Sequence, residues 1–182
     1  MDPRQVKTAA DARKIVEERK LSHVKVGVVD ADGIVRGKYM AKEKFFSALD
    51  GGFGFCDVVL GWDSNDQLVD GLSYTGWHTA YPDAMARILP QSCREVPTEG
   101  NGMVMFLGEF DGRAEEVCPR AVLRRVLKRA KDMGFSVYSA FEYEFFVFDE
   151  TPHSVREKNY RDLKPITPGF FGYSALRSSV HA

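Results

Sequence analysis

Two carboxylates, Glu142 and Glu144, lie two positions apart in the run Ser-Ala-Phe-Glu-Tyr-Glu-Phe-Phe-Val-Phe-Asp, which covers residues 139–149. The density of aromatic and β-branched residues in this run favours a β-strand. In a strand the two carboxylates point to the same face, about 6.5–7 Å apart. Because neighbouring carboxylates repel each other, a hard divalent cation that prefers oxygen ligands is a natural partner for the pair.

The same spacing also fits a strand whose polar face is simply solvated, because charged side chains are rarely buried unless they are paired. Phe146 and Phe148 follow the two glutamates on the same face of the predicted strand, so this face is not wholly polar. From the residues alone, both interpretations of this pair stay open, a metal site and a solvated polar face.

The composition is that of an ordinary soluble globular protein, with 182 residues, 44% of them hydrophobic and 28% charged. A net charge of −1 gives no electrostatic case for binding nucleic acid or an anionic membrane surface. The chain has no apolar run long enough to span a membrane and no signal-peptide pattern. Three widely spaced cysteines, Cys56, Cys93 and Cys118, argue against a disulfide framework, so we expect a cytoplasmic protein.

The first 112 residues predict a small sheet with a covering helix. Helical spacing predicts a helix over residues 3–19, and Phe45 to Leu49 form a second short helical stripe that ends at two glycines. The strands are predicted at residues 24–28, 34–40, 55–60, 85–89 and 103–110, the first two as a hairpin around an Asp-Gly turn. We expect a domain boundary near Gly112.

The clearest helix is predicted from Pro119 to Gly134, with an apolar stripe on one side and arginines and lysines on the other. The basic side could be a nucleic-acid patch, but the absence of interleaved aromatics favours a solvated face. Because the helix leads into the Glu142 strand, we expect the helix to pack on that sheet. Residues 151–168 show no period and are predicted to be a long loop.

In this order, the features resemble the N-terminal part of the glutamine synthetase family, most closely the branch that couples glutamate to amines or polyamines. The Glu-x-Glu-Phe-Phe piece after a Pro-Arg helix start is the most specific match. The matching pieces are residues 24–40, 54–62, 119–120, 141–149 and 171–174.

The resemblance implies an α+β fold, with a small β-grasp-like N-terminal domain over residues 1–112 and the start of a catalytic α/β domain over residues 113–182. Such proteins form homo-oligomeric rings in which each active site lies between two neighbouring subunits. Their reaction uses ATP to phosphorylate the γ-carboxylate of glutamate, and ammonia or an amine then displaces the phosphate. Mg²⁺ or Mn²⁺ neutralises the charge that gathers in this step.

The resemblance also implies roles for single residues. Glu142 and Glu144 match metal ligands, and Tyr138 resembles a tyrosine near the nucleotide, although a half-buried strand tyrosine is an equal alternative. Asp57 resembles an aspartate in a loop that, in ammonia-using members of the family, helps to bind ammonium in the neighbouring subunit's site. Here the serines of that loop are missing and the aspartate is offset, which favours a larger amine over ammonia.

Family members are much longer than this chain, so the resemblance implies that further metal ligands, a catalytic histidine and substrate-binding arginines lie outside it. Two carboxylates cannot complete an octahedral magnesium site. We therefore expect the 182-residue chain to be a fragment without ligase activity of its own. The alternative is a non-catalytic structural or interaction protein that retains the family fold.

Overall fold

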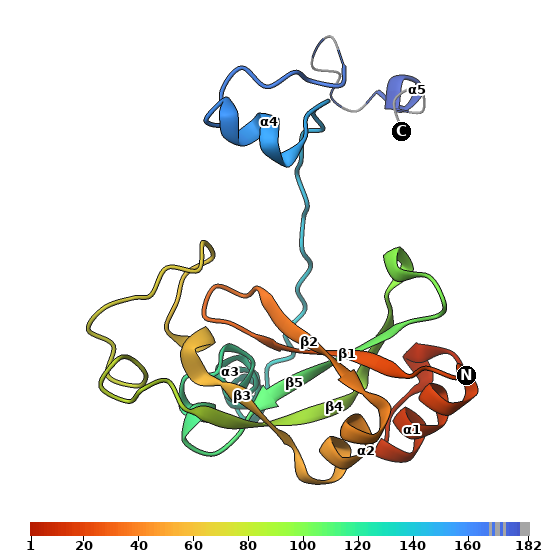
Figure 1. Ribbon diagram of the computed structural model, residues 1–182, viewed down its shortest axis with the longest axis vertical. Coiled ribbons are helices and arrows are strands. Elements are labelled where there is room, and N and C mark those ends of the chain that lie inside the picture. The colour runs from red at the N-terminus through yellow and green to blue at the C-terminus, as the bar shows by residue number, and fades with distance from the viewer. Residues whose placement is uncertain (168, 170–171, 173, 179–182) are drawn as a thin grey trace. The chain divides into compact units, whose positions relative to one another are not determined.

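The computed structural model describes residues 1–167, 169, 172 and 174–178. The chain divides into two compact units, Met1–Val137 and Tyr138–Ala182. The first unit contains the β-sheet, and the second contains two short helices, α4 (Pro152–Glu157) and α5 (Ala175–Ser178) (Figure 1). None of the helices in the described part of the chain has both the length and the apolarity needed to cross a membrane.

The sheet of the first unit has five strands in the order β2-β1-β5-β4-β3. Its strands are β1 (His23–Val29), β2 (Val35–Ala41), β3 (Phe53–Cys56), β4 (Asp83–Glu95) and β5 (Val104–Phe110). Strand β1 pairs with β2 as an antiparallel hairpin and with β5 in parallel. The hairpin and the last strand are therefore where the sequence predicts them.

The N-terminal helix begins later than predicted. A 3₁₀ turn, η1 (Pro3–Gln5), is followed by α1 (Ala9–Glu18), which starts at a capping box between Thr8 and Asp11. The Thr8 hydroxyl accepts a hydrogen bond from the Asp11 amide, and the Asp11 carboxylate accepts one from the Thr8 amide. This reciprocal cap satisfies the free amides of the first turn and sets the helix start at Ala9.

The core lies between the sheet and two helices, α1 and α2 (Lys42–Gly51). Figure 1 shows α1 and α2 together beside the sheet, and the two helices contact each other. The rings of Phe45 in α2 and Phe106 in β5 are both fully buried, with centroids 4.8 Å apart. Ile15 and Val16 of α1 are also fully buried. Hydrophobic burial therefore fixes both helices to the sheet.

Strands β3 and β4 differ in length from the predicted strands. The chain leaves β3 after Cys56 and forms a 3₁₀ turn, η2 (Asp57–Leu60), so the strand predicted for residues 55–60 is mostly wrong. Strand β4 continues well beyond the predicted residues 85–89, and its pairing with β5 shifts register between Leu89 and Arg94. Pro90 falls inside this irregular stretch, where a residue without an N–H group is tolerated.

Helix α3 (Pro119–Asp132) forms as predicted, but it does not bury its apolar stripe in the described structure. Leu123 and Val126 are 58% and 59% exposed. The side that faces the sheet carries Ala121, which is fully buried, and two arginines that pair with the buried Glu109 of β5. The helix therefore contacts the sheet of the first unit through its basic side, and the Glu142 strand on which it is expected to pack is not formed.

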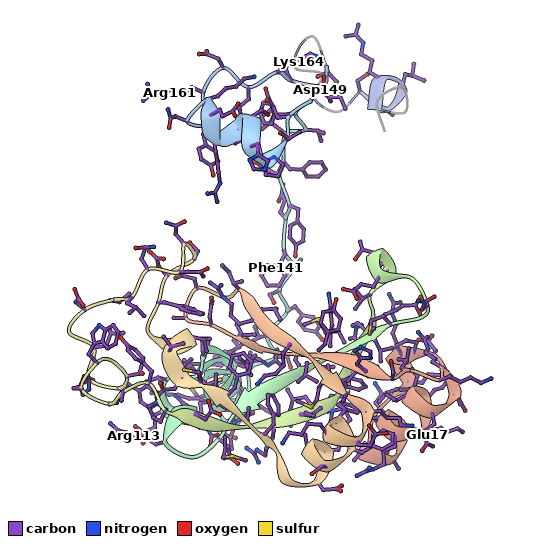
Figure 2. The ribbon with its side chains drawn as sticks, in the orientation of Figure 1. Glu17, Arg113, Phe141, Asp149, Arg161 and Lys164 are labelled. Atoms are coloured by element: carbon purple, nitrogen blue, oxygen red, sulfur yellow. The ribbon has the colours of Figure 1, made fainter. Side chains whose placement is uncertain are left out.

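The strand predicted for residues 139–149 is not formed. Residues 138–147 have no helix or strand, and an isolated bridge joins Phe148 to Pro165. A strand needs a partner for its backbone groups, and the described part of the second unit offers no more than this bridge. The side chains of the segment are exposed, as Figure 2 shows for Phe141.

The predicted loop after this segment contains helix α4, which starts at a capping box between Thr151 and Ser154. The Glu150 carboxylate accepts hydrogen bonds from the Ser154 hydroxyl, the Lys158 ammonium and the Lys164 amide. Lys164 also forms an ion pair with Asp149 (Figure 2). Of the motif predicted at residues 171–174, Phe171 and Tyr173 lie outside the described residues, as do residues 179–182.

Candidate functional site

Asp57, the first residue of η2, is the candidate site residue with the most defined surroundings. It is buried, and its amide donates a hydrogen bond to the Pro82 carbonyl over 3.0 Å. The Thr75 hydroxyl, also buried, donates a 2.6 Å hydrogen bond to the Asp57 carboxylate. Within the described residues Asp57 forms no ion pair. A buried carboxylate with one hydroxyl partner retains capacity for a cationic ligand.

A cavity of about 600 Å³ lies beside this carboxylate. Acidic and apolar side chains share its wall, which includes Asp57, Tyr74, Asp83, Met85, Asp111 and Arg113. The single arginine among these six lies over the Tyr74 ring, 5.4 Å from its centroid. Asp111 forms an ion pair with Arg87 over 3.1 Å. The mixture of carboxylates and apolar surface suits a small molecule with a cationic end and an apolar body.

Tyr74 is electrostatically coupled to Asp57. Burial raises the pKa of the Tyr74 hydroxyl, and the negative charges of Asp57 and, more weakly, Glu116 raise it further, while the Arg113 guanidinium acts in the opposite direction. The pKa of Tyr74 therefore responds to the presence of the Asp57 charge beside the cavity.

The chain between η2 and β4 supplies the neighbours of Asp57 that the sequence did not reveal. Tyr74 and Thr75 lie far from Asp57 in the chain, in a loop without hydrophobic period. Two consecutive non-glycine residues of this loop, Ala80 and Tyr81, have positive φ angles of 57° and 48°. Such angles are uncommon for these residue types and often occur in functional loops. No local sequence pattern predicts them.

Glu142, Glu144 and Tyr138 belong to the second unit, where all three side chains are exposed. Tyr138 is 95% exposed and is not the half-buried tyrosine of the alternative interpretation. Among the described residues, no group of three or more His, Cys, Asp or Glu side chains could hold a metal ion. The two glutamates offer oxygen ligands of the right kind but supply only part of a six-ligand site. Their metal-binding role stays a prediction.

Comparison with known proteins confirms the resemblance to the glutamine synthetase family over part of that family's length. Residues 116–177 match the family model "Glutamine synthetase, catalytic domain". The chain is 40% identical over 166 residues to "Type-1 glutamine synthetase 2" of Dictyostelium discoideum, covering 90% of this chain and 32% of that relative. It is 30% identical over 171 residues to "Glutamate--isopropylamine ligase" of a Pseudomonas species, covering 92% and 37%.

The fold also matches solved structures of this class. A Plasmodium falciparum glutamine synthetase structure superposes with a TM-score of 0.53 and 14% identity, over 74% of this chain and 24% of that chain. This likeness supports the mixed α/β fold. The chain spans about a third of the length of the curated relatives that it matches.

Proposed function

We propose that this chain is part of an ATP-dependent ligase that joins ammonia or an amine to the γ-carboxylate of glutamate through γ-glutamyl phosphate. The observation that carries the proposal is the similarity, over nine tenths of the chain, to relatives named as a glutamine synthetase and a glutamate–isopropylamine ligase. A carboxylate is a poor electrophile, and its phosphorylation supplies the leaving group that the amine displaces.

In this proposal Glu142 and Glu144 are ligands for Mg²⁺ or Mn²⁺, and Tyr138 lies near the nucleotide. Exposed carboxylates spaced two apart are suitable donors for a hard cation. A bound cation would neutralise the charge of the phosphate and carboxylate groups. The match to the family's catalytic-domain model covers all three residues.

The amine in this proposal binds in the cavity beside Asp57. Its ammonium end would approach the Asp57 carboxylate, and an apolar body would lie against Met85 and Tyr74. A cavity of about 600 Å³ is larger than ammonia needs, which favours a small alkylamine. One relative is named for such an amine, isopropylamine.

The domain organisation that the family resemblance implies is part of the proposal. A β-grasp-like first domain over residues 1–112 is supported by the hairpin, the helix α2 that follows it and the return of β5 beside β1 in parallel. A catalytic domain from residue 113 is supported by the family match that begins at residue 116. A cytoplasmic homo-oligomeric ring, with the site completed between subunits, is proposed from the family resemblance alone.

The metal assignment is tested by titrating Mn²⁺ into the chain and measuring its binding by electron paramagnetic resonance. Glu142→Gln and Glu144→Gln should each weaken binding at least tenfold, because each removes a charged ligand. Glu157→Gln, which changes another exposed glutamate of the same unit, is the matched control. Equal binding by all four proteins would show that the metal assignment is wrong and would favour a non-catalytic structural or interaction protein.

The amine assignment is tested by adding isopropylammonium chloride to ¹⁵N-labelled chain and following amide chemical shifts. Saturable shifts are expected at Thr75 and Ala84, and Asp57→Asn should abolish them. Asp70→Asn changes an exposed aspartate outside the cavity and should leave them intact. Unchanged binding in Asp57→Asn would overturn the assignment of Asp57.

A further inference from the structure

Asp30, at the end of β1, is a fully buried carboxylate with a complete set of partners. One oxygen accepts hydrogen bonds from the amides of Asp32 and Ile34, over 3.0 Å and 2.8 Å. The other oxygen accepts a 2.7 Å hydrogen bond from Nε of Arg36 on β2. The carboxylate therefore fixes the hairpin turn and the Arg36 side chain at the same time.

The far end of Arg36 reaches the loop that follows η2. Its guanidinium carbon lies 4.8 Å from the centroid of the Trp62 ring. Nη1 forms a 2.5 Å ion pair with Asp66, and Nη2 donates to the Asp63 carbonyl over 3.4 Å. Arg36 thus joins the hairpin to the chain on the C-terminal side of η2 by stacking, charge and a backbone contact.

The hairpin also holds η2 itself. The Ala31 amide donates a hydrogen bond to the carbonyl of Val59, a buried residue of η2, over 3.2 Å. The turn that Asp30 stabilises therefore contacts the same short element whose first residue is Asp57. The hairpin therefore contacts η2 directly at Val59. It also contacts the chain that follows η2, because Arg36 stacks on Trp62.

We propose that Asp30 and Arg36 are positioning residues for Asp57: by holding η2 and the Trp62 loop against the hairpin, they keep the Asp57 carboxylate at the wall of the cavity. The proposal rests on the amine-binding role proposed above for Asp57, but its geometry can be tested without an amine. Lysine cannot replace Arg36 fully. Its ammonium group lacks the planar guanidinium that pairs with Asp30 and Asp66 and stacks on Trp62 at the same time.

Tyr74 gives a second readout beside amide exchange, because its pKa depends on the Asp57 charge as well as on burial. The charge of Asp57 contributes to raising the pKa of Tyr74, after burial. If Asp57 leaves the cavity wall, this contribution is lost and the pKa of Tyr74 falls towards its ordinary value. The titration of [¹³Cζ]tyrosine-labelled protein by NMR measures this shift.

Arg13 of α1 is the matched control. Like Arg36, it combines an ion pair, to Asp50 over 2.7 Å, with a hydrogen bond to a carbonyl, that of Phe46 over 2.8 Å. Its guanidinium carbon lies 5.0 Å from the Phe46 ring centroid. Arg13 connects α1 to α2 through these contacts and is not among the residues that line the cavity.

The experiment compares Arg36→Met, Arg36→Lys and Arg13→Met in the 182-residue chain. In Arg36→Met, the amides of Gly61 and Val69 should exchange with solvent at least about tenfold faster, and the pKa of Tyr74 should fall. Arg36→Lys should give an intermediate result because it keeps the charge. Arg13→Met should leave both readouts unchanged.

If Arg36→Met fails to fold because Asp30 is left buried and unpaired, the neutral double variant Asp30→Asn/Arg36→Met removes that charge and should show the same two changes. An unchanged Tyr74 pKa in a folded Arg36 variant, or equal changes in Arg13→Met, would overturn the proposal. Loss of isopropylammonium binding in Asp57→Asn is a separate measurement. The binding measurement therefore tests the amine proposal, and the Arg36 variants test the positioning proposal, so that either proposal can fail without the other.

Discussion

Two aromatic runs of this chain have similar sequence patterns and different surroundings. In β5, Phe106 and Phe110 are fully buried: Phe106 lies against Phe45 of α2, and Phe110 lies against Phe55 of β3. In the segment of residues 138–147, Phe141 and Phe145 are 86% and 78% exposed. The first run pairs with β1 on one side and β4 on the other, whereas the second has no strand partner among the described residues.

The comparison shows that strand propensity alone does not make a strand. Aromatic and β-branched residues fit a pleated surface, but the backbone groups need a neighbour and the side chains need a second layer. The β5 segment obtains both within the first unit. The Glu142 segment has the composition of a strand without these partners in the described part of its unit.

The largest expected difference between the two runs is in stability. Phe106→Ala should lower the free energy of unfolding by about 3–5 kcal/mol, because it leaves a cavity in the core. Phe141→Ala should change it by less than about 0.5 kcal/mol, because the ring is already exposed. Urea denaturation followed by far-UV circular dichroism measures both. A comparable loss in Phe141→Ala would mean that the second run is packed in solution.

A smaller effect is expected where α3 meets the sheet. Glu109→Gln should lower the free energy of unfolding by about 1–2 kcal/mol and speed amide exchange in α3, because Arg120 and Arg124 lose their charged partner. Glu116→Gln, an exposed glutamate in the turn before α3, is the control. Unchanged exchange in Glu109→Gln would show that the ion pairs do not orient the helix.

The second unit should respond to acid at Glu150. Hydrogen bonds from Lys158, Ser154 and the Lys164 amide lower the pKa of this carboxyl from 4.5 to about 2. Its contribution to local stability is therefore complete above about pH 4.5 and is lost as the pH falls through 2. Exchange of the Lys164 amide, corrected for intrinsic rate, should rise over this range. In Glu150→Gln this exchange should be faster at neutral pH and nearly independent of pH.

The smallest stability effect is expected at the candidate metal ligands. Glu142→Gln and Glu144→Gln should each change the free energy of unfolding by less than about 0.5 kcal/mol, because both side chains are exposed. The midpoint of urea denaturation measures this in metal-free buffer. A clear stabilisation by either substitution would reveal carboxylate repulsion in the free chain and would sharpen the case for a bound cation.

Helix α3 shows where prediction from sequence stops. The periodicity of Val122 to Met133 gave the helix and its apolar stripe correctly, because both are local properties. The side turned to the sheet depends on Glu109, a residue of the preceding strand whose burial no local pattern reveals. The amphipathic pattern therefore identified the apolar side of α3 but not which side of the helix contacts the sheet.

The candidate site likewise contains one residue that the sequence could identify and several that it could not. Asp57 could be chosen from sequence by its resemblance to a family loop. Its partner Thr75, the coupled Tyr74 and the supporting Arg36 are distant in the chain and follow no spacing rule. Only the folded chain brings Thr75 and Tyr74 next to Asp57, and Arg36 next to Trp62 in the loop that follows η2.

The sequence by itself determined the β1–β2 hairpin, helices α1, α2 and α3 and the family resemblance, because turn residues, hydrophobic period and motif order are local or linear signals. The tertiary structure decided the length of β4, the side on which α3 packs and the burial of Asp57 beside a cavity. These features depend on contacts between residues far apart in the chain, and their energies exist only once the sheet has assembled.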